Sequence, residues 1–262
     1  MLERTLQEAA LADTVKDIRS QAPGMGAYKL YLILKDVYGS KMCGRDRFYK
    51  LMHKHHLMLT PQRGRHTTNS NHNYRKYKNR IKGFVPCAPN DLWVVDITYI
   101  DTDEGVCYLH LVTDAFTRQI IGWVLSNNLM AVHTIAALEQ AIAQSEQSDL
   151  SHLIHHSDRG AQYCCNQYIS RLIQIGATIS MTEDYQPTDN AIAERVNGII
   201  KQEWLYRMKR PKDAHQATEL LSGIIEFYNN RRPHRSNGMK TPIQMRKMYV
   251  EEHSLEASRL QP

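Results

Sequence analysis

The sequence lacks the features of several classes of protein. No apolar run in its 262 residues approaches the roughly 20 needed to cross a bilayer, and its N-terminus has no signal-peptide core. It contains no internal repeat and no low-complexity tract. We therefore expect a cytoplasmic globular protein, and an apolar content of 42% provides a core for one large domain or two modest ones.

Cysteine and glycine patterns also exclude some kinds of site. The five cysteines are an odd number without a Cys-x-x-Cys pair, so reduced buried thiols are expected rather than disulfides. Gly24-Met-Gly26 follows no strand and lacks a third spaced glycine, which argues against a nucleotide-binding loop. No Ser, Tyr or Cys stands in a setting typical of a covalent nucleophile.

The positive charge is concentrated in one segment. Residues 45–82 hold eleven Lys and Arg against one acid, a net charge of +10, so the rest of the +6 chain carries −4. Such a run can be merely solvated, but the interleaved Tyr74 and Tyr77 favour a nucleic-acid partner. We expect one segment to hold a polyanion while a mildly acidic part acts on it.

The N-terminal part has helical periodicity. Apolar spacing predicts helices over 4–20, 27–38 and 45–56, and a glycine-bounded turn joins the last two, as in a helix-turn-helix. Three-helix units that bind nothing look similar. The candidate DNA contacts here are Arg45, Arg47, Lys50 and Lys54, followed by Arg63 and Arg65 in a polar, basic linker.

After Pro89 the pattern changes to strands and helices. Strands are expected over 92–101, 106–114, 119–125, 151–156 and 177–182, and helices over 131–147, 163–175, 189–208 and 213–230. This order describes an α/β fold, a mixed sheet with helices on its faces. The expected division is a helical module at 1–59, a basic linker at 60–88, a catalytic core at 89–250 and a C-terminal tail at 251–262.

Three carboxylates stand where packing does not explain them. Asp96 interrupts an apolar strand, where an unpaired charge is costly. Asp158 follows a strand at a glycine turn, and Glu194 lies one turn into a helix. Any single acid can be an ordinary surface residue, since the chain has 27. Together they predict an oxygen-ligand site for Mg²⁺ or Mn²⁺.

Such a site suits phosphodiester chemistry with two metal ions. Asp96 would bridge both ions, Asp158 would hold one and Glu194 the other. Lys201 lies seven residues after Glu194 on the same helix face, so it can direct a cation at a substrate phosphate. Glu203 faces roughly the other way and is expected to form a salt bridge.

Several stretches then carry a resemblance to a known family. They are Pro89-Asn-Asp-Leu-Trp-Val-Val-Asp-Ile-Thr-Tyr-Ile100, His156-Ser-Asp-Arg-Gly-Ala-Gln-Tyr163, Asp189-Asn-Ala-Ile-Ala-Glu-Arg-Val-Asn197, Lys201-Gln-Glu203 and Tyr228-Asn-Asn-Arg-Arg-Pro-His234. Over roughly residues 20–245 the chain resembles the second-reading-frame (OrfB) transposases of the insertion-sequence-three family. These have a retroviral-integrase-like, ribonuclease H-like core with a DDE triad.

The resemblance implies a function and its residues. Asp96, Asp158 and Glu194 would be the metal ligands, Lys201 would lie near the phosphate, and other residues would support the site or approach DNA: His156, Arg159, Gln162, Asn190 and Arg195. Such enzymes cut DNA at element ends and transfer the strand to a target. Implied partners are terminal-repeat and target DNA, a homo-oligomer on that DNA, and an upstream reading-frame product or fusion, with action at the nucleoid.

The sequence departs from the family's pattern at Asn237, where leucine is usual. Two rival functions stay open: a plain metal-dependent nuclease, and an inactive DNA-binding derivative that inhibits transposition. Trp93 and Tyr99 are expected in the core, on the sheet face opposite Asp96. Tyr228, Arg232 and His234 would either contact DNA or lock the last helix onto the sheet.

Overall fold

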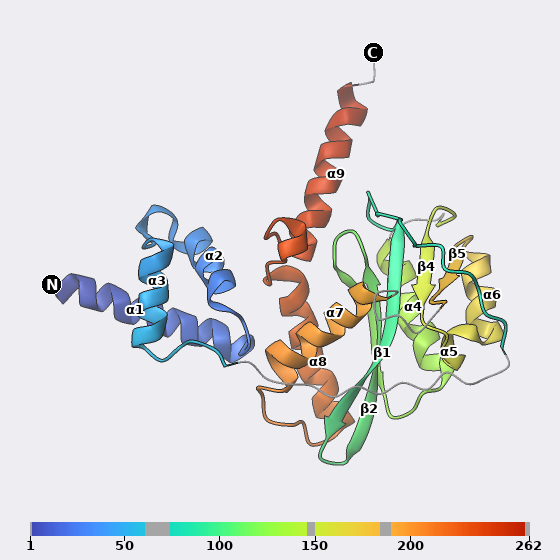
Figure 1. The fold of residues 1–262 in the computed structure, drawn as a ribbon, viewed down its shortest axis with the longest axis horizontal. Helices are drawn as coiled ribbons and strands as arrows, with labels where there is room; N and C mark the ends of the chain where they lie inside the picture. The colour runs from blue at the N-terminus through green and yellow to red at the C-terminus, as the bar shows by residue number, and fades with distance from the viewer. Residues whose placement is uncertain (1, 61–73, 146–149, 184–189, 260–262) are drawn as a thin grey trace.

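The computed structural model describes residues 2–60, 74–145, 150–183 and 190–259. Figure 1 shows an N-terminal group of three helices beside a sheet that carries helices on both faces. The candidate DNA contacts Arg63 and Arg65 lie outside the described residues.

Five strands form one mixed sheet in the order β3-β2-β1-β4-β5. The long hairpin of β1 (Leu92–Thr102) and β2 (Gly105–Asp114) continues into β3 (Ile120–Ser126), and these three strands are antiparallel. On the other side of β1, the short strands β4 (Ile154–Ser157) and β5 (Thr178–Met181) run parallel to it. The expected α/β mixed sheet is confirmed.

One face of the sheet is covered by α4 (Ala131–Ser145), α5 (Ala161–Cys164) and α6 (Asn166–Gln174). Side chains alternate along a strand, and Trp93 and Val95 of β1 pack on this face. Trp93 is fully buried, as predicted. Tyr99 has the same parity but is 39% exposed, so its predicted place in the core is wrong. It lies near the free end of the hairpin, where it packs edge-on against Tyr108 instead.

The opposite face is covered by α7 (Ala191–Ile200), its π-helical continuation η2 (Lys201–Leu205) and α8 (Ala214–Asn230). Asp213 caps α8 by accepting a hydrogen bond from the Gln216 amide at 2.9 Å. After the short 3₁₀ turn η3 (Arg235–Asn237), α9 (Pro242–Arg259) extends away from the body of the molecule (Figure 1). The sequence suggested that a tail begins at residue 251, but the helix continues past this boundary to Arg259.

The N-terminal module consists of α1 (Leu2–Gln21), α2 (Ala27–Tyr38), the 3₁₀ turn η1 (Gly39–Lys41) and α3 (Arg45–Lys54). All three expected helices are present. Their buried apolar residues belong to the same core cluster as those of α7 and α8: Val15, Leu30, Leu34, Phe48 and Met52 meet Val196, Leu221 and Ile225. The module is therefore packed against the catalytic part.

Two other details differ from expectation. Instead of one helix over 163–175, an extended Cys165 separates α5 from α6. Residues 78–82 of the expected linker lie along the edge strand β5, where the Arg80 amide donates to the Ser180 hydroxyl at 2.8 Å. The Met181 amide also donates to the Lys78 carbonyl at 3.4 Å, a contact that uses a backbone group left unpaired at the edge of the sheet. Among the helices described, none has the length and apolarity that a membrane crossing requires.

Candidate active site

The register of β1 and β4 brings the two aspartates together. These strands are parallel, with Val94 opposite His156. Strand β1 continues through Asp96, whereas β4 ends at Ser157, so Asp158 is the first residue beyond it. Counting two residues on from the Val94–His156 pair, we expect Asp96 and Asp158 at the same level, and neighbouring strands lie about 4.8 Å apart. Both positions are even-numbered, on the same side as Leu92 and Val94, which face α7.

Helix α7 brings Glu194 to the same place. The N-cap residue of α7, Asn190, donates a hydrogen bond from Nδ2 to the Val95 carbonyl at 3.0 Å. Two turns later, Asn197 donates from Nδ2 to Oδ2 of Asp96 at 2.6 Å. Glu194 lies between these two asparagines at helical spacing, so all three share the face of α7 that crosses β1.

The charges of the other two acids act on Asp96. The pKa of Asp96 is raised to about 7: burial contributes most, and the negative charges of Asp158 and Glu194 add to it, against the hydrogen bonds from the Ile97 amide and Asn197. Asp158 is held by a turn of its own, in which Oδ1 accepts from the Gly160 amide at 2.9 Å. Three carboxylates thus share one end of the sheet.

The three carboxylates are not close enough together in this structure to bind one metal ion jointly. Within the described ranges, no group of three or more His, Cys, Asp or Glu side chains is close enough to hold a metal ion together. The close gathering that the sequence suggested is therefore not seen in this structure. One oxygen of Asp96 instead accepts a hydrogen bond from Asn197. The all-oxygen donor set itself fits a hard divalent cation.

Lys201 is also placed at this site. Burial lowers the pKa of its ammonium group, while the charges of Asp96 and Asp101 oppose that shift. Lys201 is thus a half-buried cation that interacts with Asp96, and its contact with a substrate phosphate stays a prediction.

The other family-implied residues have different surroundings. His156 is fully buried, and its Nδ1 lies 2.8 Å from the Ser180 hydroxyl, so it joins β4 to β5. Arg159 and Gln162 are half-buried beside Asp158, whereas Arg195 is exposed. The residue that sequence reasoning missed is Asn197. A buried asparagine in the middle of a helix is unfavourable without a partner, and this was the available signal.

Tyr228, Arg232 and His234, at the end of α8 and just after it, have a structural role. All three side chains are buried, the His234 ring packs edge-on against Tyr228 at 4.7 Å, and Arg232 binds Glu203 through Nε at 2.8 Å and Nη2 at 2.7 Å. The sequence left open whether these residues contact DNA or hold the last helix in place. In the structure they hold the end of α8. The expected salt bridge of Glu203 is confirmed.

The basic residues of α3 lie on an exposed surface of the module. Arg45, Arg47, Lys50 and Lys54 are all exposed, but Arg47 and Lys54 each pair with Glu8 of α1 at 3.2 Å. Part of the positive charge on this surface is thus neutralised within the module.

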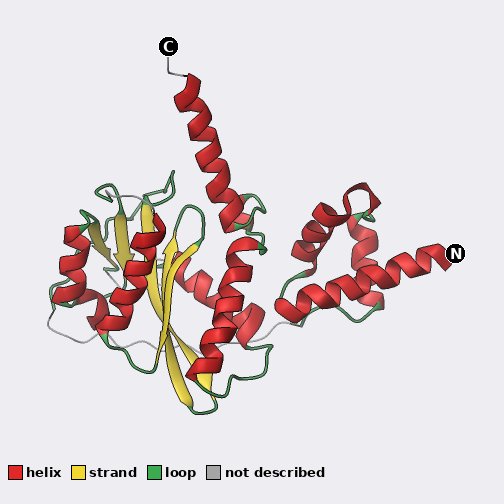
Figure 2. Cartoon of the chain, turned by 180° about the vertical axis from the view of Figure 1, so that it is seen from behind, coloured by secondary structure: helices red, strands yellow, loops and turns green. Residues whose placement is uncertain are grey.

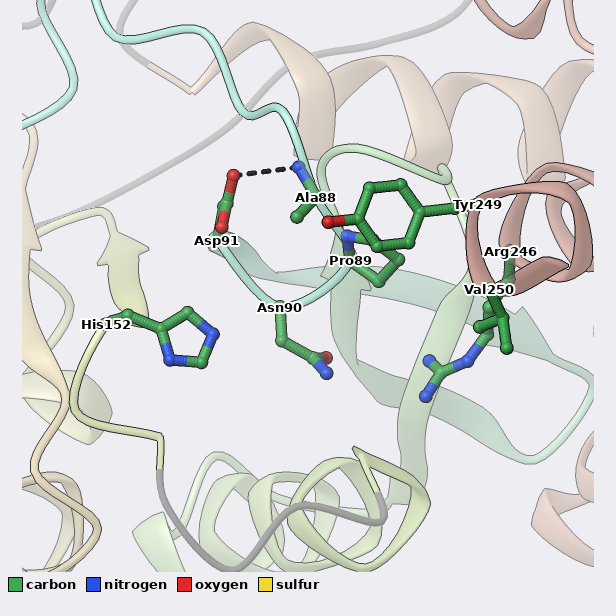
Figure 3. A pocket seen from close by; sticks show the side chains of 8 residues that line it. All are labelled: Ala88, Pro89, Asn90, Asp91, His152, Arg246, Tyr249 and Val250. Atoms are coloured by element: carbon green, nitrogen blue, oxygen red, sulfur yellow. Dashed lines mark hydrogen bonds between the residues drawn. The ribbon is translucent and has the colours of Figure 1, made fainter. Parts of the chain in front are cut away.

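A separate cavity of about 350 Å³ lies near the start of β1 (Figure 3). Its lining consists of Ala88, Pro89, Asn90, Asp91, His152, Arg246, Tyr249 and Val250. Asp91 is committed there to the backbone, accepting from the amides of Cys87 and Ala88 at 2.8 Å. The cavity contains none of the three acids and is not part of the site.

Comparison with known proteins gives the family. Two models, each described as an integrase core domain, match residues 86–187 and 175–242. The 31 kDa protein of insertion element IS600 from Shigella sonnei is 36% identical over 209 residues, which cover 79% of this chain and 76% of that protein. The chain belongs to the insertion-sequence transposases.

Other relatives agree with this transposase family. The transposase InsF of insertion sequence IS3A from Escherichia coli is 35% identical over 47% of this chain and 42% of its own length. The putative transposase of IS986/IS6110 from Mycobacterium tuberculosis is 36% identical over 170 residues, and this chain covers only 61% of its length. The resemblance to the insertion-sequence-three family is confirmed.

A solved structure supports the fold. The simian T-cell lymphotropic virus intasome in complex with the PP2A regulatory subunit B56 gamma contains a chain that superposes with a TM-score of 0.53 at 18% identity. The match covers 88% of this chain and 74% of that one. The transposase therefore has the retroviral-integrase, ribonuclease H-like fold.

Proposed function

We propose that this chain is a DDE transposase that cleaves DNA at the ends of an insertion sequence and transfers the strand to a target. One observation supports the proposal: Asp96 and Asp158 each follow the paired residues Val94 and His156 by two positions, and helix α7, which carries Glu194, bonds to Asp96 through Asn197. Asp96 and Asp158 are half-buried and Glu194 is exposed, so the support is their shared location and not the burial of all three acids.

The proposed cofactor is Mg²⁺ or Mn²⁺, two ions per site, held by Asp96, Asp158 and Glu194. When bound, these ions would neutralise phosphate charge and activate the attacking oxygen. They would also relieve the repulsion that raises the pKa of Asp96.

The chain's own residues orient the reactants. Asn197 holds one oxygen of Asp96 in a fixed direction, and the glycine turn does the same for Asp158. Lys201, beside Asp96, supplies a positive charge for the substrate phosphate. Arg159, next to Asp158, is a second candidate for contact with DNA.

We further propose that the helical module up to residue 59 and the basic segment at 60–88 bind the terminal repeats and the target. Support comes from the four exposed basic residues of α3 and from the charge of +10 over residues 45–82. Homo-oligomers on DNA, action at the nucleoid, and an upstream reading-frame product as partner or fusion complete the proposal.

The test uses duplex oligonucleotides with element-end sequences, incubated with the protein and either Mg²⁺ or EDTA and resolved on a denaturing gel. End cleavage and joining with Mg²⁺, both abolished in Asp96→Asn with DNA binding retained, are the expected results. Cleavage without joining would indicate a plain nuclease. Binding without either reaction would indicate an inhibitor, and joining by Asp96→Asn would refute the triad.

A further inference from the structure

The π-helical turn η2 joins the active site to the N-terminal module. It continues α7, which carries Glu194, and it begins with Lys201. Its widened turn is closed by a hydrogen bond from the Tyr206 amide to the Lys201 carbonyl at 2.9 Å, five residues apart. Single π-turns within helices are uncommon and occur mostly at functional sites.

Two hydrogen bonds attach this turn to the end of α1 and the loop that follows it. The Gly24 amide donates to the Glu203 carbonyl at 2.6 Å, and the Trp204 indole donates to the Gln21 carbonyl at 2.7 Å. Gly24 is required by close approach, because a Cβ there would collide with the Glu203 backbone. Gly24, which the sequence excluded from a nucleotide-binding loop, therefore allows the close packing of the two segments.

A buried ion cluster completes the attachment. We call Lys29, Glu203 and Arg232 the anchor cluster. Lys29 Nζ, on α2, lies 3.0 Å from Oε1 of Glu203, whose two oxygens also receive the forked bond from Arg232. The three side chains are 18%, 15% and 2% exposed. Burial alone would raise the pKa of Glu203, but the bonds and charges of Arg232 and Lys29 lower it below its ordinary value.

Buried charges of this kind are weak sources of stability, because desolvation offsets most of their attraction. Fixing one geometry is a better-supported role for them. Lys201, which interacts with Asp96, lies only two positions before Glu203, which is held by the module. Any rotation of the turn that frees Glu203 from Lys29 would therefore also turn Lys201 relative to Asp96.

We propose that the anchor cluster is a positioning device: by docking the N-terminal module onto η2, it sets the orientation of Lys201, and of the helix that carries Glu194, for strand transfer. This inference rests on the proposed function. In it Lys29 is a positioning residue that acts through Lys201 and does not touch the substrate.

Lys29→Met is the test variant, because Glu203 keeps the forked bond to Arg232 and no buried charge is left alone. The measurement is the single-turnover rate of joining an element-end duplex to target DNA with Mg²⁺. We expect Lys29→Met to lower the rate about tenfold, since small losses of orientation are costly in rate. Lys247→Met, exposed on α9 and outside the module, should leave the rate unchanged, and Lys29→Arg should keep most of the parent rate.

A double-mutant cycle separates positioning from general destabilisation. In a Lys201→Ala background, Lys29→Met should change the rate by less than about twofold, because the two residues act in one chain of contacts. An equal loss in both backgrounds, or no loss in the parent, would overturn the proposal.

Hydrogen exchange gives a readout that does not need activity. Lys29→Met should speed amide exchange in residues 20–26 and 199–207, whereas Glu194→Gln should not. Unchanged exchange in Lys29→Met would overturn the docking role. If the parent protein joins no DNA while Lys29→Met speeds exchange, the proposed function fails and the docking contact stands.

Discussion

Replacing Asp96 with asparagine should stabilise the metal-free protein at neutral pH. The pKa of Asp96 is about 7 in the folded chain, against an ordinary value of 3.8, because burial and the charges of Asp158 and Glu194 disfavour its ionised form. The folded state therefore binds the proton more tightly than the unfolded state. This contribution to stability is fully present below pH 3.8 and is lost as the pH rises through 7.

The size of the effect follows from the same values. Each tenfold difference in proton affinity corresponds to about 1.4 kcal/mol, so the interval from 3.8 to about 7 sets an upper bound of about 4 kcal/mol. Local relaxation and water entry reduce it, and we expect roughly 2 to 4 kcal/mol. Asparagine carries no charge at any of these pH values and can still accept the bond from Asn197.

The assay is urea unfolding in EDTA at pH 5 and pH 8. From pH 5 to pH 8, the free energy of unfolding of the parent should fall by roughly 2 kcal/mol more than that of Asp96→Asn. Asp101→Asn, an exposed acid on the same strand, serves as the control and should follow the parent. Adding Mg²⁺ at pH 8, at a hundredfold excess over Kd, should stabilise the parent by about 2.7 kcal/mol. It should not stabilise Asp96→Asn. Parallel pH profiles for parent and Asp96→Asn would refute the reasoning.

Three further predictions use other contacts. Asn197→Ala removes the 2.6 Å bond to Asp96 and should lower the joining rate about tenfold while leaving the circular dichroism spectrum unchanged. Gly122→Ala should destabilise the fold by about 3 kcal/mol or more in urea, because its Cβ would collide with the backbone of α4, whereas Gly223→Ala, with open space on a helix, should stabilise it by up to about 1 kcal/mol. Glu8→Gln should tighten DNA binding in a salt titration, because it releases two cations of α3, and unchanged affinity would argue against this surface.

Local patterns along the chain were sufficient for most of the elements. Helix α2 and strand β1 follow from their apolar periodicity, because a helix and a strand repeat at different intervals and each has one face to bury. Helix α9 did not follow, since its apolar residues form no clear stripe. The π-turn at Lys201–Leu205 was also beyond local reasoning, because Glu203 is held by Lys29 and Arg232, which lie 174 and 29 residues away in the sequence.

The three acids show the same division. That Asp96, Asp158 and Glu194 need an explanation could be read from the sequence, because a carboxylate in a strand or at a glycine turn conflicts with its local surroundings. Their proximity was decided by the strand register and by the crossing of α7 over β1, which no local pattern encodes. The same packing decided that Asn197 binds Asp96, and that Arg232 and His234 are buried rather than free to meet DNA. Sequence determines which groups are costly to bury, and tertiary structure determines which partners offset that cost.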